Sequence, residues 1–107
     1  MKVAIHQPEY LPHLGLLAKI KAVDLFVLLD DVQFNRASLQ HRAKIAGPRG
    51  MEWLTIPFRH AHPQTIDAVE IADPTWWWQH RNRIAGIYQA APGYAAARPY
   101  IDRLLAD

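Results

Sequence analysis

The chain has 107 residues, of which 50% are apolar, and its formal net charge is +2. Its length suits one domain with one modest core, and its apolar content excludes an intrinsically disordered chain. The absence of cysteine excludes disulfides, thiolate nucleophiles and cysteine-type zinc sites. The small net charge argues against nucleic acid as a partner.

Nothing in the sequence predicts contact with a membrane. Its apolar runs fall well short of the ~20 residues that a membrane-spanning helix needs. The chain begins with Met1-Lys2 and enters an apolar strand directly, without the pattern of a signal peptide. We therefore expect no membrane span and a cytoplasmic protein.

The first elements in chain order are expected to form a strand–helix–strand unit. Apolar runs predict strands over residues 2–6 and 24–30, and near-helical apolar spacing predicts a helix over 13–22 between them. Pro8 and Pro12 bracket the loop before this helix, because proline and the residue before it resist helix formation. A helical crossover returns the chain to the same edge, so the two strands are expected to be parallel.

A β-hairpin is expected next, over residues 41–58. The sequence Gly47-Pro48-Arg49-Gly50 is a strong turn signal inside it. His60 and His62 follow in a proline-terminated loop, where we expect both side chains to be exposed to solvent. Residues 68–71 are apolar enough to predict a further short strand.

Two helices are expected to complete the chain, over residues 75–90 and 95–106, with the helix-breaking pair Pro92-Gly93 between them. Trp76 to Trp78 cannot all face one side of a helix, because successive positions turn by about 100°. At least one should reach the surface, so we expect the chain to self-associate as a homo-oligomer. Together the elements predict one α/β domain over residues 1–107, with a parallel βαβ start, an inserted β-hairpin and C-terminal helices.

Polar residues follow both strands of the βαβ unit. His6 and Gln7 end the first strand, and Asp30 and Asp31 end the second. Ligands of open α/β sheets bind at the edge where parallel strands end, so these residues form the main candidate site. We assign His6 as a general base, and Asp30 or Asp31 as its orienting partner or as a ligand of a divalent cation. The alternative is structural: His6 bonds backbone groups, and the aspartates form a polar strand end.

Basic residues concentrate in the middle of the chain. Residues 35–63 carry five basic side chains against one acidic side chain, whereas the segments on either side each have a net charge of −1. The guanidinium groups of arginine bind carboxylates and phosphates well, so Arg36 and Arg42 are expected to hold an anionic donor substrate. A solvated hairpin face would explain the same charges.

The stretch His13-Leu14-Gly15-Leu16 follows the first strand and opens a helix, as the His-x-Gly-His signature of nucleotidylyltransferases does. Leu16 stands in the place of the second histidine, which stabilises the transferring phosphate, so the stretch argues against nucleotidyl transfer. His13 itself has two possible roles. It is either a second imidazole that contacts the ligand beside His6, or the cap of the following helix.

Two blocks of sequence resemble the WbqC-like protein family. The first is Lys2-Val3-Ala4-Ile5-His6-Gln7-Pro8-Glu9-Tyr10-Leu11-Pro12, and the second is Leu28-Leu29-Asp30-Asp31-Val32-Gln33-Phe34. The likeness continues in order over nearly the whole chain, through Arg42, Ile45, Gly50, Trp53-Leu54-Thr55-Ile56-Pro57, Ile71, Trp78, His80, Ile84, Tyr88 and Ala91-Pro92. We place Gln7 and Gln33, one from each block, among the substrate-binding residues.

Members of this family occur in bacterial O-antigen and other polysaccharide or small-molecule gene clusters, and a glycine or aminoacyl transferase role has been suggested from gene context. The resemblance implies a transferase that moves an aminoacyl or acyl group to an amino sugar and acts on a small anionic or sugar-linked substrate. A non-catalytic binding or accessory module is the alternative.

The resemblance also implies that this chain is the N-terminal part of a longer fold, because family members are usually much longer. Two positions depart from the family pattern. His13 stands where a tryptophan is common, and His41 stands where an asparagine often precedes Arg42.

Overall fold

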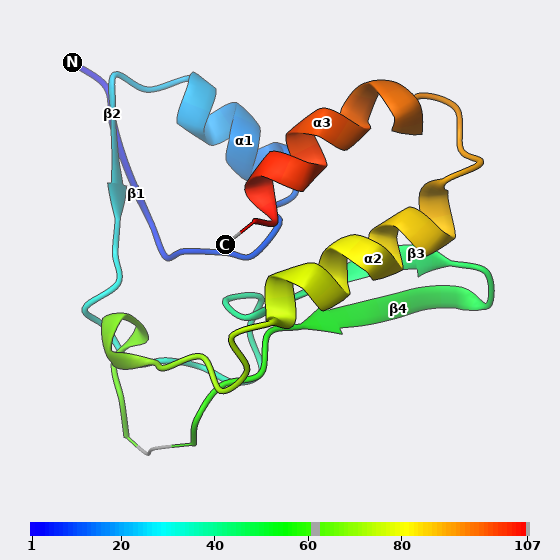
Figure 1. Cartoon of the computed structure of the whole chain (residues 1–107). Coiled ribbons are helices and arrows are strands. Elements are labelled where there is room, and N and C mark those ends of the chain that lie inside the picture. The colour runs from blue at the N-terminus through cyan, green and yellow to red at the C-terminus, as the bar shows by residue number, and fades with distance from the viewer. Residues whose placement is uncertain (61–62, 107) are drawn as a thin grey trace.

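The computed structural model describes residues 1–60 and 63–106, and its elements are labelled in Figure 1. In chain order they are β1 (Val3–His6), α1 (Leu14–Lys21), β2 (Leu25–Leu28), β3 (Arg42–Gly47), β4 (Gly50–Thr55), the 3-10 helix η1 (Ile66–Ala68), α2 (Trp76–Tyr88) and α3 (Tyr94–Leu104). The fold is the α/β arrangement expected from the sequence: a parallel start, an antiparallel hairpin and C-terminal helices.

Strands β1 and β2 are parallel, as the helical crossover predicts. Their register runs from Val3 opposite Leu25 to His6 opposite Leu28, and α1 connects them. Ala4 is buried, whereas Val3 and its face neighbour Ile5 are exposed. Alternate residues of a strand face opposite sides, so this two-stranded sheet has one covered face and one open apolar face.

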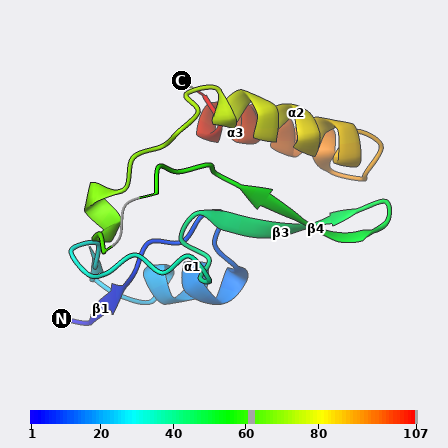
Figure 2. The same ribbon diagram turned by 90° about the horizontal axis from the view of Figure 1, so that it is seen from below.

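Strands β3 and β4 form the hairpin, with Gly47 paired to Gly50 at its turn. Gly50 has φ 114°, a value that favours glycine because a side chain would strain the backbone there. α2 runs along the hairpin in both views of the ribbon (Figures 1 and 2).

The core lies between the hairpin and the C-terminal helices. Leu54 of β4 is 0% exposed and clusters with Ile84 of α2 and Leu105, which follows α3. Burial of each of these side chains contributes roughly 1.5–3 kcal/mol. Partly buried side chains pack around the cluster: Tyr10, Ile45, Trp76, Trp77, Tyr88, Tyr94 and Ile101.

The tryptophan run divides between core and surface. Trp76 and Trp77 are half-buried against the core, and Trp78 is 51% exposed. This is the outcome that the rotation of successive helical positions predicts. Within the described residues, none of the helices has the length and apolarity that a bilayer crossing requires.

The strand predicted over residues 68–71 is wrong. Part of it belongs to η1, and Ile71 makes only an isolated bridge to Phe58. The backbone N–H groups of Ile66 and Asp67 donate instead to the carbonyl oxygens of Val32 and Asp30, at 2.9 and 2.8 Å. These contacts hold the preceding segment against the loop that follows β2, where it turns into a 3-10 helix rather than extending as a strand.

Candidate functional site

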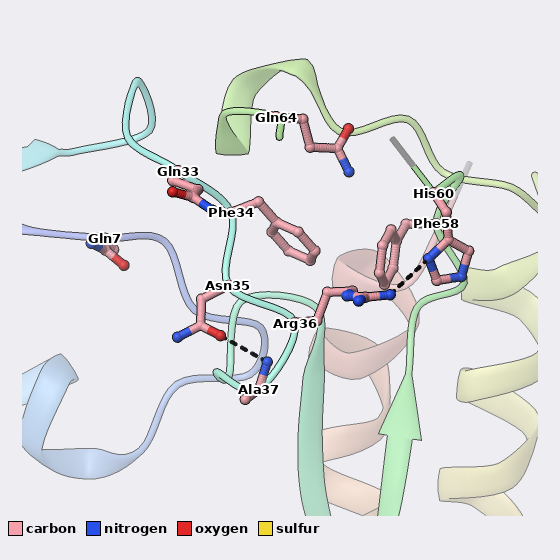
Figure 3. A pocket seen from close by; sticks show the side chains of 9 residues that line it. All are labelled: Gln7, Gln33, Phe34, Asn35, Arg36, Ala37, Phe58, His60 and Gln64. Atoms are coloured by element: carbon pink, nitrogen blue, oxygen red, sulfur yellow. Dashed lines mark hydrogen bonds between the residues drawn. The ribbon is translucent and has the colours of Figure 1, made fainter. Parts of the chain in front are cut away.

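A pocket of about 800 Å³ lies where the segment that follows β2 meets the loops that follow β1 and β4 (Figure 3). Its volume falls in the range of small-molecule sites. Nine of the described residues line it: Gln7, Gln33, Phe34, Asn35, Arg36, Ala37, Phe58, His60 and Gln64. These nine combine side-chain amides, an arginine, a histidine and two phenylalanine rings, and none of them carries a carboxylate.

Backbone pairing joins two distant segments at this pocket. Gln33 forms an antiparallel bridge with Thr65, and the N–H of Phe34 donates to the carbonyl oxygen of Gln64 at 2.8 Å. Gln33 and Phe34 are thereby fixed against the loop before η1. In Figure 3 the side chains of Gln33 and Gln64 consequently border the same space.

Two further backbone contacts complete the frame. The N–H of Tyr10 donates to the carbonyl oxygen of Leu39 at 3.0 Å and ties the loop after β1 to residues 35–40. The bridge between Phe58 and Ile71 fixes the chain just after the hairpin. The pocket is thus built by loops, while β1–β2 and the hairpin hold the ends of those loops.

An aromatic cluster forms the wall of the pocket. The ring centroids of Phe34 and Phe58 lie 4.8 Å apart, and His41 contacts both rings edge-on at 5.2 and 5.0 Å. The ring centroid of His60 also lies 4.8 Å from that of Phe58. Burial, and then the charge of Arg42, lower the pKa of His41, so its imidazole is neutral near pH 7. Its buried Nδ1 atom has no hydrogen-bond partner among the described residues.

Gln40 is not among the lining residues, but its side chain connects two segments that line the pocket. Its side-chain NH₂ donates to Oε1 of Gln7 at 2.6 Å, and its Oε1 accepts from the backbone N–H of Asn35 at 3.1 Å. Across the pocket, Nη1 of Arg36 donates to Nδ1 of His60 at 3.2 Å, a contact drawn in Figure 3. Gln40 therefore holds the loop after β1 to the loop after β2.

His6 is paired with Glu9 at the edge of this region. The Nε2 atom of His6 lies 2.7 Å from a carboxylate oxygen of Glu9, and its Nδ1 atom lies 3.5 Å from Nζ of Lys19. A carboxylate only accepts, so Nε2 carries the proton. His6 itself does not line the pocket, although the next residue, Gln7, does.

The sequence profile of the WbqC-like protein family matches residues 7–107. The chain belongs to the WbqC-like protein family. This WbqC-like chain is 31% identical over 96 residues to the uncharacterized protein Rv1507c of Mycobacterium tuberculosis, and the match covers 88% of the chain and 42% of that relative. The chain thus spans less than half the length of this curated relative. No solved structure matches it.

In this WbqC-like fold, three of the predicted site residues meet in one pocket: Gln7, Gln33 and Arg36. Arg42 has a different place. Its Nε and Nη2 atoms donate to the carbonyl oxygens of Ser38 and Ala37 at 3.2 and 2.9 Å, and its guanidinium lies 4.1 Å above the ring of Trp53. It anchors the loop that carries the pocket residues and does not line the pocket.

His13 adopts the second of its two expected roles. Its Nδ1 atom accepts a hydrogen bond from the backbone N–H of Leu16 at 3.3 Å and so caps α1. Asp30 and Asp31 lie beyond the end of β2 with exposed side chains, and neither lines the pocket. The structure places the aspartates and His6 at ends of neighbouring parallel strands, but the partner that it gives His6 is Glu9.

Several residues of this region were not predicted as site residues, among them His60, which lines the pocket, and Glu9, which contacts His6. His60 is exposed, as expected, yet it lines the pocket, while His62 lies outside the described residues. The sequence does indicate the Glu9–His6 pair, because a carboxylate three residues after a histidine in a proline-bounded turn can fold back onto that histidine.

In the described ranges 1–60 and 63–106, no three His, Asp or Glu side chains are grouped so that they could hold a metal ion.

Proposed function

We propose that this WbqC-like chain takes part in group transfer, moving an aminoacyl or acyl group to an amino sugar during bacterial surface-polysaccharide biosynthesis. The pocket carries the proposal. Its amides suit the hydroxyl groups of a sugar-linked substrate, Arg36 suits an anionic group, and the rings of Phe34 and Phe58 offer an apolar wall.

His6 would act as the general base in this reaction. It would take a proton from the acceptor amine as the amine nitrogen attacks the acyl carbonyl carbon and the donor's leaving group departs. Glu9, at 2.7 Å, would stabilise the imidazolium that forms. The proton would arrive at Nδ1 of His6, so Lys19 would first have to release its 3.5 Å contact with that atom. Asp30 or Asp31 would provide a second carboxylate at the same edge of the sheet.

Transfer can be tested without knowing the substrate in advance. The purified chain is incubated with a bacterial metabolite extract, and products are detected by mass spectrometry as new acyl-amino sugar adducts. We expect His6→Ala to abolish the adduct. His13→Asn is the matched control, because asparagine also caps helices and should keep α1 intact. An adduct that forms equally with His6→Ala would remove His6 from the mechanism.

A specific observation supports the non-catalytic alternative. None of the nine lining residues carries a carboxylate, hydroxyl or thiol, and His6 lies outside the lining. A binding or accessory module would retain metabolites in a pull-down with both wild type and His6→Ala, and neither protein would yield an adduct.

A further inference from the structure

The acceptor oxygen of Gln7 is already used inside the protein. The backbone N–H of Asn35 can only donate, so the atom of Gln40 that it meets at 3.1 Å must be the amide oxygen. This fixes the orientation of the Gln40 amide and turns its NH₂ group toward Gln7, at 2.6 Å. Gln7 therefore accepts with its oxygen and keeps its own NH₂ group for another partner.

The same logic fixes Asn35 and His60. The Oδ1 atom of Asn35 accepts from the backbone N–H of Ala37 at 2.9 Å, which leaves the NH₂ group of Asn35 over. A guanidinium has donors only, so Nδ1 of His60 accepts from Arg36 at 3.2 Å. The neutral ring of His60 then carries its proton on Nε2.

The side-chain groups here that are left without any partner among the described residues are all donors, whereas the amide oxygens of Gln7 and Asn35 each already accept one hydrogen bond. The unpartnered donors are the NH₂ groups of Gln7 and Asn35, the Nε2–H of His60 and the other N–H groups of Arg36. In the described part of the chain, no hydrogen bond uses the NH₂ of Gln7, the NH₂ of Asn35 or Nε2 of His60. Figure 3 shows that these four side chains come from two sides of the pocket.

From this donor set we infer that the pocket selects a small molecule that bears an oxyanion, a phosphate or a carboxylate, and rejects a cationic amine. Oxyanions accept hydrogen bonds with every oxygen, and charge-assisted bonds are stronger than neutral ones. A protonated amine would meet the charge of Arg36 and these unpartnered donors, and none of the nine described lining residues offers it a carboxylate. Gln33 and Gln64, whose amides are not fixed in this way, can serve the hydroxyl groups of the same ligand.

The inference rests on the proposed function in one respect: it takes this pocket as the substrate site, and it names the class of the donor substrate. It also assigns a position to each of the two substrates. The anionic donor occupies the pocket, and the amine of the acceptor approaches from outside it, on the side of the His6–Glu9 pair.

Four probes that share a hexose ring test the selection: glucose 1-phosphate, glucuronate, glucose and glucosamine. Binding to the full chain is measured by calorimetry near pH 7. We expect one or both anionic sugars to bind about tenfold or more tightly than glucose, and glucosamine to bind most weakly. The comparison between the first two probes tells phosphate from carboxylate. Equal binding of all four, no binding of either anion, or a preference for glucosamine would overturn the inference.

Two substitutions reverse the donor pattern and leave the internal bonds in place. Gln7→Glu keeps an oxygen for Gln40 and puts a charged oxygen where the NH₂ group was. Asn35→Asp does the same beside Ala37. Each should weaken binding of the preferred anionic probe by about tenfold or more. Gln89→Glu adds the same charge at the C-cap of α2, outside the lining, and should leave binding unchanged.

Circular dichroism and thermal unfolding verify that each variant is folded, and the two reversals are independent of one another. Anion binding that survives both reversals in folded protein would refute the inference. Because binding is read without turnover, the outcomes separate: anion selection without transfer refutes only the proposed function, and transfer without anion selection refutes only the inference.

Discussion

The hydroxyl of Tyr10 and Nδ1 of His80 lie 2.8 Å apart, although 70 positions separate the two residues in the sequence. On the other side of the ring, Nε2 lies 2.9 Å from the carbonyl oxygen of Thr55. A carbonyl only accepts, so Nε2 donates to Thr55 and Nδ1 accepts from Tyr10. This buried chain of hydrogen bonds connects the loop after β1 to both β4 and α2.

Acid should weaken the fold through His80. Burial lowers its pKa below 6.5, so below that pH the unfolded chain binds more protons than the folded one. The stabilising effect of the neutral ring is complete above pH 6.5 and is lost as the pH falls through the folded-state value. Urea unfolding between pH 7.5 and 5 measures this dependence. In His80→Gln the dependence should flatten, leaving the part from His41, whose pKa is also lowered. An unchanged slope would contradict the assignment.

Tyr10→Phe should destabilise the fold by about 1–3 kcal/mol, because it leaves the buried Nδ1 atom of His80 without its donor. Tyr100→Phe is the matched control, since Tyr100 is 64% exposed and its change should stay within about 0.5 kcal/mol. The free energy of unfolding in urea at pH 7.5 measures both. Similar small effects in the two variants would show that the Tyr10 bond contributes nothing.

High pH should weaken the fold through Tyr10. Burial raises the pKa of Tyr10 to about 12, above its usual 10.0. The contribution of the neutral phenol is complete below pH 10 and is lost as the pH rises through the folded-state value. Tyrosinate absorbance in the folded chain should therefore include one group that titrates late, and Tyr10→Phe should remove that group. A titration curve that keeps the late group in Tyr10→Phe would assign it to another tyrosine.

Arg42→Ala should weaken binding of glucose 1-phosphate by about 1.5–3 kcal/mol, because the loop that carries Asn35 and Arg36 loses its anchor. It should lower the free energy of unfolding as well, whereas Arg36→Ala should reduce binding alone. Arg59→Ala is the control, since among residues 1–60 and 63–106 the Arg59 side chain makes a single ion pair, an exposed one with Glu70 at 3.8 Å. Calorimetry and urea unfolding of the three variants separate these roles. Equal, small binding losses for Arg42 and Arg59 would mean that the basic segment is only a solvated face.

The isolated chain should self-associate at micromolar concentration through the open face of the β1–β2 sheet. Val3, Ile5, Leu25 and Val27 are all exposed there, and parallel sheets normally have both faces covered. Sedimentation velocity tests this, with Ile5→Glu expected to give monomers. Leu14→Glu, a change at an exposed residue of α1, should not. A wild-type chain that sediments as a monomer would contradict the prediction.

Local patterns explain why most of the fold could be predicted. The parallel pair follows from a short crossover, and the hairpin follows from the turn between Gly47 and Gly50. Residues 68–71 could not be predicted in the same way, because the preceding segment takes its hydrogen bonds from residues 30 and 32, far earlier in the chain. Periodicity within a segment carries no information about such a distant partner.

The site divides along the same line. Gln7 was predicted because it follows a strand end, Gln33 because its block resembles the family, and Arg36 because arginine forks suit anions. The structure places all three in the pocket lining. Phe58 and His60 come from the loop after β4, where Phe58 forms an isolated bridge with Ile71, and such a bridge leaves no repeat in the sequence. Arg42 was singled out because it is basic. The structure shows that its N–H groups donate to the backbone carbonyl oxygens of Ser38 and Ala37.

The construction of the pocket from separate loops has a thermodynamic consequence. A ligand that touches residues 7, 33–37, 58, 60 and 64 together binds only when these loops are assembled, and the unfolded chain has no equivalent site. By mass action, a ligand at one hundred times its dissociation constant would add about 2.7 kcal/mol to stability. The melting temperature can therefore serve as the detector in a blind screen of metabolites, with Gln7→Glu as the reference in which tenfold weaker binding should cut the added stability to about 1.4 kcal/mol.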